Sequence, residues 1–512
     1  MMQGRSVLTP PFPDPPIRPH TLAHMSSKQR RRGSFAIDAL KLMSGSTLAQ
    51  IITILAAPIL TRLYGPAAFG VLGLFVATTR ILTQVAGLRY ELAIMLPKED
   101  EEAINVAGLT LSLVLLTSVL LIPITMLLGK PLALWVNAAD IIPYLWLLPV
   151  SVFFGGNLIA LNYWHSRQRH FGRLSIVRLV QSSTAAGVQL GVGYAGTPSG
   201  GGLITGLISG QTVAAIALAG MGWRSMLPLA RRALSRQGMF DALKRYQKFP
   251  KYNVWATLMN AISWQLPTFF LSYFFSSIEV GFFALGNRVI ELPMRLIGSS
   301  IAQVFFQRAS EARHDGSLHL VVASTFRYLV TLSFFPLMLL IFIAPELFSL
   351  IFGAKWHEAG VYTQLLAPWI FFWFISSPMS TLFSVLEKQE WSFRLNAAIL
   401  ISRFLALGLG GYVGSARLML VFFALSGVLL YGFLSIKVMQ LSGVHLNVIF
   451  KILWQKGWPM LPASGILILL KIVNAPDAIL LLSAVLLLGL YYAYQLRTEP
   501  QLQTLLKKRF AS

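Results

Sequence analysis

The feature that most constrains this chain is a series of apolar segments, each about 20 residues long, that recur from Phe35 almost to the C-terminus. A helix rises about 1.5 Å per residue, so one such segment covers the roughly 30 Å of hydrocarbon in a bilayer. A soluble fold of 512 residues could not hide this surface, because 55% of the residues are hydrophobic and only 12% are charged. The sequence therefore predicts an all-α polytopic membrane protein.

We predict about 14 transmembrane helices from the length and spacing of these segments. Their ranges are Leu40–Leu60, Ala67–Leu96, Ile104–Leu128, Asp140–Trp164, Leu174–Ala195, Gly202–Trp223, Val254–Phe275, Gly281–Phe306, Leu320–Ile343, Val361–Leu386, Leu395–Val413, Leu418–Val438, Trp458–Val473 and Ala478–Leu496. The thirteenth is short and contains Pro459 and Pro462. Twelve spans plus a re-entrant or surface pair is the alternative.

The net charge of +23 is explained by topology. With the amino terminus inside, most of the 42 Lys and Arg residues fall on the cytoplasmic side. Those assigned to the outer loops are Arg62, Lys130, Lys355, Arg417 and Lys471. This asymmetry predicts that both termini are cytoplasmic, and it attributes the basic charge to anionic lipid rather than to nucleic acid.

The sequence divides into four predicted regions. Residues 1–34 are a Pro-rich, disordered N-terminal extension without the apolar core of a signal peptide, so we expect no cleavage; Met25 is an alternative start. Residues 35–250 form an N-terminal six-helix lobe with a basic cytoplasmic linker, and 251–443 a C-terminal six-helix lobe. Residues 444–512 supply two additional helices and a cytoplasmic tail.

An internal repeat supports the two lobes. The segments Ser46–Phe75 and Ala256–Gly286 share Thr-Leu followed by Gln or Asn, a Pro within the helix and a Gly that opens the next helix. The paired positions are Pro58 with Pro267 and Gly70 with Gly281. Parallel repeats with a binding site between them are a known transporter plan.

Charged residues inside the eighth span mark a candidate site. Each Arg or Lys at a helix centre costs at least about 2.5–3.5 kcal/mol on insertion scales. Arg288, Glu291 and Arg295 are spaced by three and four residues, which puts them on one face of a continuous helix. These three residues predict one of two arrangements. They form either a positively charged face that lines a polar cavity, or a set of charges that neutralise one another on one helix and serve only the packing between helices.

The second span carries a similar polar face. Arg80, Gln84, Gly87 and Glu91 fall on one side of a helix, whereas Arg89 points nearly opposite. Because this span is long, Arg89 and Glu91 are expected near the cytoplasmic headgroups, either as an interfacial pair or as substrate ligands. Arg80 lies deeper and is the stronger candidate. By repeat symmetry, the second and eighth spans are counterparts that would meet at one central cavity.

Several classes of function are excluded or disfavoured. The chain has no Cys, so it forms no disulfide or thiolate metal site, and it has no P-loop pattern for ATP hydrolysis. His165 and His170 lack a third ligand, so no metal or other cofactor is expected. The outer connections are too short for an extramembrane catalytic domain, and we do not expect an enzyme. Weaker candidates for cavity-lining residues are Gln50, Asn157, Asn162, Gln181, Asn260, Trp264 and Gln265.

Three stretches, "LTRLYGPAAFGVLGLF", "RYELAIMLPKEDEEA" and "IELPMRLIGSSIAQVFFQRASEA", resemble lipopolysaccharide and polysaccharide biosynthesis flippases. These belong to the multidrug/oligosaccharidyl-lipid/polysaccharide exporter superfamily and include the O-antigen and colanic-acid type translocases. The resemblance runs from about Phe35 to the end. It implies two pseudo-symmetric six-helix bundles around a central cavity, alternating access and, in some members, two extra C-terminal helices.

The resemblance also implies a substrate and a location. The substrate class is an oligosaccharide unit on undecaprenyl diphosphate, which is moved across the bacterial inner (plasma) membrane. The other expected partners are the membrane lipids, a glycan polymerase and a chain-length regulator. The expected substrate-binding residues are Arg80, Gln84, Arg89, Arg288 and Arg295. Arginine pairs with phosphate through two hydrogen bonds, and a carboxylate beside it can change charge state, so Glu91 and Glu291 are the expected ion-coupling residues.

Other functions remain open at this stage. A multidrug exporter of the same fold predicts acidic residues in the cavity. A membrane-embedded glycan polymerase or ligase predicts a large basic outer loop, and a non-transporting scaffold leaves the charges inside the membrane unexplained.

Overall fold

The computed structural model describes residues 45–498, except for the side chains of Arg295, Leu296 and Ser299. Over this range the chain folds into helices joined by turns, as predicted. The predicted disordered extension at 1–34 and the end of the cytoplasmic tail lie outside the described residues.

The helices fall into three consecutive groups. The N-terminal half contains Gly45–Leu63, α2 (Pro66–Ala86), α3 (Asp100–Trp135), α4 (Leu147–Arg167), α5 (Phe171–Tyr194), α6 (Gly200–Ala233) and α7 (Arg236–Arg245). The C-terminal half contains α8 (Val254–Phe274), α9 (Ser277–Ile290), α10 (Ser299–Asp315), α11 (Leu318–Phe352), α12 (His357–Met379), α13 (Leu382–Val385), α14 (Gln389–Tyr412) and α15 (Ala416–Leu441). The last group is α16 (Leu446–Gly457), α17 (Met460–Ile472) and α18 (Asp477–Thr498).

Ten helices in the described range are long and apolar enough to cross a membrane. Four further predicted spans correspond to α5, α8, the α9–α10 pair and α17, which do not meet the same criteria of length and composition. The multi-pass membrane fold is therefore confirmed, whereas the count of 14 spans is not.

The second span is shorter than predicted. We expected one helix over Ala67–Leu96, but α2 ends at Ala86 because Leu88 and Arg89 adopt positive φ angles of 48° and 65°. A short 3-10 helix, η1 (Tyr90–Met95), follows the turn. The predicted common face of Arg80 and Glu91 was therefore wrong, since the two residues lie on different elements.

The eighth span is also interrupted. α9 ends at Ile290, a wide π-helical turn occupies Met294–Gly298, and α10 begins at Ser299. Pro293 explains the break, because it has no N–H to donate and its ring clashes with the carbonyl of Val289. The expectation that Arg288, Glu291 and Arg295 share one face of a continuous helix was therefore wrong.

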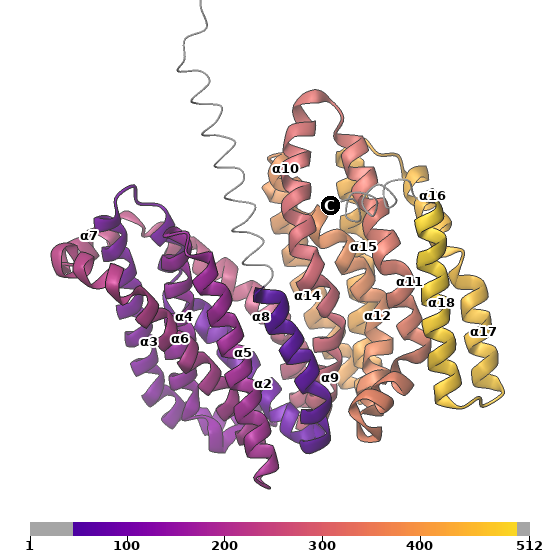
Figure 1. Ribbon diagram of the computed structural model, residues 1–512, viewed down its shortest axis with the longest axis horizontal. Coiled ribbons are helices and arrows are strands. Elements are labelled where there is room, and N and C mark those ends of the chain that lie inside the picture. The colour runs from indigo at the N-terminus through magenta and orange to yellow at the C-terminus, as the bar shows by residue number, and fades with distance from the viewer. Residues whose placement is uncertain (1–44, 499–512) are drawn as a thin grey trace, which may run out of the picture.

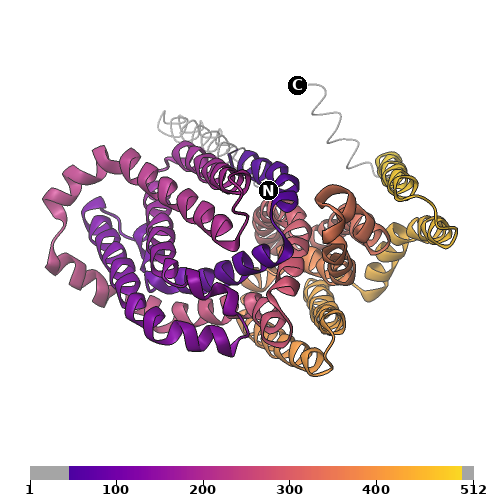
Figure 2. The ribbon, with the colours of Figure 1, turned by 90° about the horizontal axis from the view of Figure 1, so that it is seen from below.

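The two halves lie side by side, with α17 and α18 on the outside of the C-terminal half (Figures 1 and 2). The same packing pattern occurs in each half: α3 packs on α4 and α6 on both α4 and α5, just as α11 packs on α12 and α15 on both α12 and α14. This correspondence agrees with a duplicated fold.

The halves meet most closely where α2 runs along α9. A Cβ at Gly70 would overlap the carbonyl oxygen of Ser277, and a Cβ at Gly281 would overlap the carbonyl oxygen of Pro66. The repeat-related glycines thus bring the two backbones into direct contact.

Hydrogen bonds between described residues join the halves at this same end. Ser277 donates to the Asp140 carboxylate at 2.6 Å, and Asn137 donates to the carbonyl oxygen of Phe275 at 3.1 Å. The indole N–H of Trp356 donates to the carbonyl oxygen of Thr61 at 2.9 Å. The topology predicted from the sequence assigns this end of the α2–α9 contact to the outer side, and we therefore call it the outer seal.

Candidate substrate cavity

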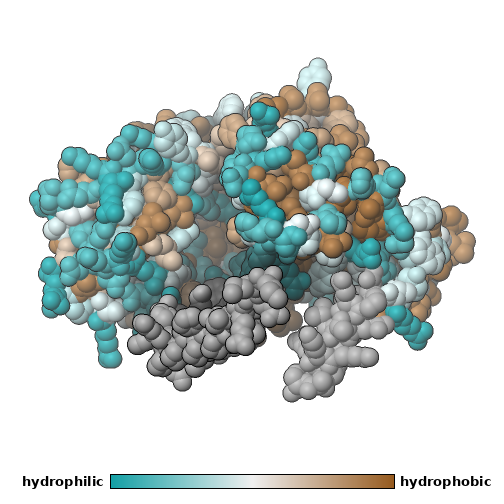
Figure 3. All heavy atoms as spheres, turned by 90° about the horizontal axis from the view of Figure 1, so that it is seen from above, coloured by the Kyte–Doolittle hydropathy of each residue, from teal (hydrophilic) through white to brown (hydrophobic). Residues whose placement is uncertain are grey.

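A cavity of about 460 Å³ lies between the two halves on the inner side of the outer seal. Its walls come from helix Gly45–Leu63, α2, α5 and α6 on one side and from α8 and α9 on the other. Seen from the α7 end, the molecular surface dips between the two groups of helices, and hydrophilic residues gather around this end (Figure 3). Both halves of the repeat therefore contribute to one chamber.

Two of the predicted site residues line this cavity together. Arg80 comes from α2 and Arg288 from α9. Arg80 follows the start of α2 by 14 residues, or about 21 Å, and Arg288 follows the start of α9 by 11 residues, or about 16 Å. The backbone positions of both arginines are therefore near the middle of the distance that a helix needs to cross a bilayer.

The remaining polar lining is neutral. No Asp or Glu is among the described residues that line the cavity. Gln50, Gln181 and Gln265 line it as the sequence suggested, and further polar lining residues are Thr53, Ser182, Gln189, Thr268 and Asn287. A chamber with two arginines, many hydrogen-bonding groups and no carboxylate is chemically suited to an anionic, hydroxyl-rich ligand.

Gln84, in the last turn of α2, forms a separate group with Arg89 and Glu91, which follow the end of that helix. Arg89 Nη1 lies 3.0 Å from Glu91 Oε1 and donates to Gln84 Oε1 at 3.3 Å. The predicted opposition of Arg89 and Glu91 was wrong, because the left-handed turn rotates Arg89 back toward both partners. None of the three is among the cavity-lining residues.

Contacts of η1 place this group at the α7 end of the N-terminal half. The Tyr90 hydroxyl donates to the carbonyl oxygen of Leu243 at 2.9 Å, so η1 is tied to α7. Glu91 is buried, with an exposed fraction of 4%. Burial raises the pKa of Glu91, and neither its backbone hydrogen bond nor the neighbouring Arg89 charge cancels the rise.

Glu291 lies immediately after α9 and is also buried. The side-chain amide of Asn287 donates to its Oε1 at 2.6 Å. Asn287 lines the cavity next to Arg288, so Glu291 is one hydrogen bond away from the lining. The side chain of Arg295 lies outside the described part of the structure.

The sequence reasoning missed a third arginine in the membrane. Arg403, in the middle of α14, has an exposed fraction of only 2% and does not line the cavity. The insertion cost that singled out Arg288 applies equally to this residue, so the signal was present in the sequence. The partners in the outer seal, Asp140 and Ser277, were missed because their pairing depends on how the halves dock.

Comparison with known proteins agrees with this architecture. A family model described as "polysaccharide biosynthesis protein" matches residues 59–361, more than half of the chain. Comparison with curated proteins finds no match.

Solved structures of similar fold are membrane transporters. The lipid II flippase MurJ in an inward closed conformation matches with a TM-score of 0.67 at 11% identity, covering 90% of this chain and 99% of that chain. An inward-facing multidrug resistance MATE family transporter of the MOP superfamily matches with a TM-score of 0.57 at 16% identity, covering 78% of this chain and 94% of that chain. A Vibrio cholerae MATE transporter matches with a TM-score of 0.51 at 13% identity, covering 81% of this chain and 97% of that chain.

The duplicated helical fold and the sequence match over both halves thus agree with the expected family. The chain belongs to the polysaccharide biosynthesis protein family and has the fold of MOP-superfamily flippases and transporters.

Proposed function

We propose that this chain is a flippase, not an enzyme, that moves undecaprenyl-diphosphate-linked oligosaccharide units across the bacterial inner membrane. The observation that carries the proposal is the shared cavity with Arg80 on one half and Arg288 on the other. A diphosphate must be desolvated to cross a medium of low dielectric constant, and two guanidinium groups offset part of that cost through charge-assisted hydrogen bonds. The amide and hydroxyl groups of the lining suit the first sugars.

The proposed mechanism is alternating access between the lobes predicted at 35–250 and 251–443, with 444–512 as an accessory region. The contacts of the outer seal are formed in this structure, which supports the proposal that the cavity is loaded from the cytoplasmic side. The basic connection between α6 and α8 supports a cytoplasmic location for the α7 end and for both termini. A glycan polymerase and a chain-length regulator are the partner classes that we propose on the O-antigen type of pathway.

We propose that Glu291 couples transport to an ion. It is buried, and Asn287 links it to the cavity beside Arg288. A proton or sodium ion at this carboxylate would change the charge next to the substrate-binding arginine. Glu291→Gln should leave flipping measurable but insensitive to an imposed ion gradient. Glu91, Arg89 and Gln84 are proposed to act earlier, where substrate approaches from the cytoplasmic side, and Arg295 keeps its proposed substrate role.

A drug exporter is not favoured by the cavity. A cationic drug would be repelled by Arg80 and Arg288, and the described lining offers no carboxylate to bind it. We therefore advance no second function.

The test is a flipping assay in liposomes with an undecaprenyl-diphosphate-linked oligosaccharide. Loss of a charge-assisted hydrogen bond costs about 1.5–3 kcal/mol, so Arg80→Gln and Arg288→Gln should each lower the rate by about 10- to 100-fold. Arg80→Lys should recover part of the loss, because it keeps the charge but not the paired hydrogen bonds.

Arg236→Gln, an exposed arginine on α7, is the matched control and should keep the wild-type rate. A glycolipid with the same sugars but no phosphate tests the head group, since its transport should not depend on either arginine. Wild-type rates for the diphosphate substrate in both well-folded cavity variants would refute the proposed role. Transport of a cationic dye without transport of the lipid would instead establish the drug exporter.

A further inference from the structure

Arg178 of α5 lies one helical turn from the lining of the central cavity. Gln181 and Ser182, which line the cavity, follow it by three and four residues and so lie on the same face of α5. Arg178 Nη1 donates to the hydroxyl of Ser46, and Ser46 precedes the lining residue Gln50 by one turn of its own helix. The contact between Arg178 and Ser46 therefore forms the next layer of the same cavity wall.

This layer lies on the side of the cavity that faces the α7 end. Arg178 follows the start of α5 at Phe171 by 7 residues, or about 10 Å. α5 starts just after Arg167, which donates to the carbonyl oxygen of Pro97 at 2.7 Å, in the connection between η1 and α3. Because η1 is itself tied to α7, α5 starts at the end that we propose to be cytoplasmic. Arg178 thus stands between that end and the cavity.

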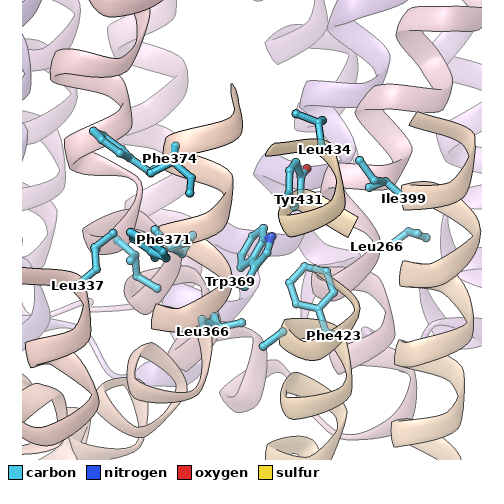
Figure 4. Close-up of a cluster of buried hydrophobic side chains, with 14 of the residues drawn as sticks. Leu266, Leu337, Leu366, Trp369, Phe371, Phe374, Ile399, Phe423, Tyr431 and Leu434 are labelled. Atoms are coloured by element: carbon cyan, nitrogen blue, oxygen red, sulfur yellow. The ribbon is translucent and has the colours of Figure 1, made fainter. Parts of the chain in front are cut away.

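Arg403 shows how this fold encloses an arginine within a group of packed helices. It lies on α14, which corresponds to α5 in the packing pattern of the two halves, and is only 2% exposed. It donates to the carbonyl oxygen of Ser263 at 3.3 Å and to the hydroxyl of Tyr431 at 3.1 Å. The ring centroids of Trp369 and Phe423 lie 5.7 and 5.5 Å from its Cζ. Figure 4 shows Trp369, Phe423 and Tyr431 close together in this interior.

Arg178 is not enclosed in this way. It is only partly buried, and the Ser46 hydroxyl is its one hydrogen-bond partner among the described residues. No carboxylate in the described part of the chain forms an ion pair with it, and no described ring lies over it. A guanidinium group carries five N–H donors, so most of those of Arg178 remain for water or for a ligand.

Packing of the two helices does not require this arginine. A Cβ at Gly45 would overlap Ser175 of α5, so helix Gly45–Leu63 and α5 already touch one another closely beside Arg178. An arginine at membrane depth also costs free energy to insert, and one neutral hydroxyl offsets little of that cost. A charge that packing does not need, placed beside the cavity and partly open, is suited to an anionic ligand.

We propose that Arg178 is a loading residue, which binds the substrate diphosphate on its way from the cytoplasmic side to Arg80 and Arg288. This inference rests on the proposed function and adds an intermediate position for the anionic head group. On arrival of the substrate, the guanidinium exchanges the neutral Ser46 hydroxyl for a phosphate oxygen, which is a stronger, charge-assisted acceptor. Arg178 therefore sets the substrate concentration at which transport saturates, whereas Arg80 and Arg288 set the rate of transport.

Flipping in liposomes at increasing mole fractions of an undecaprenyl-diphosphate-linked oligosaccharide tests the proposal. Arg178→Gln should raise the half-saturating mole fraction by about 10-fold, as expected for loss of one charge-assisted hydrogen bond, and should keep the rate at saturation. Arg178→Lys should recover part of the loss, because it retains the charge. Arg224→Gln, an exposed arginine on the neighbouring helix α6, is the matched control and should keep both wild-type values. A lower saturated rate with an unchanged half-saturating mole fraction in Arg178→Gln would overturn the proposal.

Ser46→Ala separates a ligand role from a structural one. If Arg178 served only to hold helix Gly45–Leu63 against α5, loss of its partner would give the same defect as Arg178→Gln. We expect Ser46→Ala to keep the wild-type half-saturating mole fraction, and an equal defect in the two variants would contradict the loading role.

A thiol at position 46 gives a readout that does not depend on the folding of Arg178→Gln. The chain has no Cys, so Ser46→Cys introduces a single thiol beside Arg178. Undecaprenyl diphosphate should slow the reaction of this thiol with a water-soluble reagent, whereas undecaprenol, which has no phosphate, should not. Equal reaction rates with the two lipids would refute binding at this position.

The same flipping data separate this inference from the proposed function. Wild-type saturation in Arg178→Gln, together with slow flipping in Arg80→Gln and Arg288→Gln, would remove the loading role and leave the flippase in place. Wild-type behaviour of all three variants would refute both.

Discussion

Gly70 of α2 and Gly281 of α9 occupy equivalent positions in the two repeats and pack backbone to backbone across the boundary between them. Neither position has room for a side chain: a Cβ on Gly70 overlaps the carbonyl oxygen of Ser277, and one on Gly281 overlaps the carbonyl oxygen of Pro66. The close contact at the outer end therefore depends on the absence of a Cβ at both positions.

Gly70→Ala should open the outer seal. The overlapped atom is a backbone carbonyl oxygen, which cannot rotate away, so α2 and α9 must separate. The chain contains no Cys, so a single Ala284→Cys in the cavity wall reports this directly. A membrane-impermeant thiol reagent applied from outside should label Cys at 284 faster in the Gly70→Ala background.

Gly187→Ala is the control for that experiment, because a Cβ at this position on α5 meets nothing within 4 Å. It should leave the labelling rate unchanged. Equal labelling in the two glycine variants would show that the glycine contact does not close the outer end.

A disulfide across the outer seal should arrest transport. Ser277 and Asp140 belong to opposite halves and are hydrogen-bonded at 2.6 Å, so Asp140→Cys with Ser277→Cys brings two thiols close together. Under oxidising conditions we expect loss of most of the flipping rate, and reduction should restore it. The single Cys variants should be insensitive to oxidant; full activity of a quantitatively crosslinked protein would contradict movement at this end.

The raised pKa of Glu91 should make the stability of the folded chain depend on pH. Burial raises its pKa in the folded state above the value of about 4.3 expected for an unfolded chain, so the folded state binds the proton more tightly. The resulting contribution to stability is fully present below about pH 4.3 and is lost as pH rises through the raised folded-state pKa.

The measurement is the thermal midpoint of the wild-type chain and of Glu91→Gln from about pH 4 to pH 8. The variant lacks the titrating group, so the difference between its thermal midpoint and that of the wild type should shift in favour of the variant as pH rises. A difference that stays constant over the whole range would contradict the raised pKa.

The α17–α18 pair should be fixed to the C-terminal half mainly by buried aromatic packing. The Tyr491 ring stacks on Phe335 at a centroid distance of 4.5 Å, and its hydroxyl donates to the carbonyl oxygen of Thr331 at 3.0 Å. Tyr491→Ala should lower the free energy of unfolding by about 3–5 kcal/mol, as for other large-to-small core substitutions.

Lys471→Gln should cost much less, about 0.2–1 kcal/mol. This residue pairs with Glu346 at 2.8 Å, but the lysine side chain is 36% exposed, so solvent screens the pair. Denaturant unfolding of both variants checks the ranking. A larger loss of unfolding free energy for Lys471→Gln than for Tyr491→Ala would contradict the view that aromatic packing, rather than the ion pair, fixes α17 and α18 to the C-terminal half.

The sequence predicted the helical class, most helix positions and the cavity-lining roles of Arg80 and Arg288, because length, hydropathy and the cost of buried charge are local properties. It failed where a few residues redirect the backbone. The positive φ angles at Leu88 and Arg89 and the break beside Pro293 changed which side chains share a face. The contacts of Asp140 with Ser277 and of Arg403 with Tyr431 depend on tertiary docking, which helical periodicity does not encode.

α2 and α9 each carry both a glycine of the outer seal and an arginine of the cavity. Because a helix is stiff over this length, any tilt that parts Gly70 from Gly281 also swings Arg80 and Arg288 through an arc. In the proposed transport cycle, opening of the outer seal and displacement of the two cavity arginines are therefore coupled, so a mutation that changes one also changes the other.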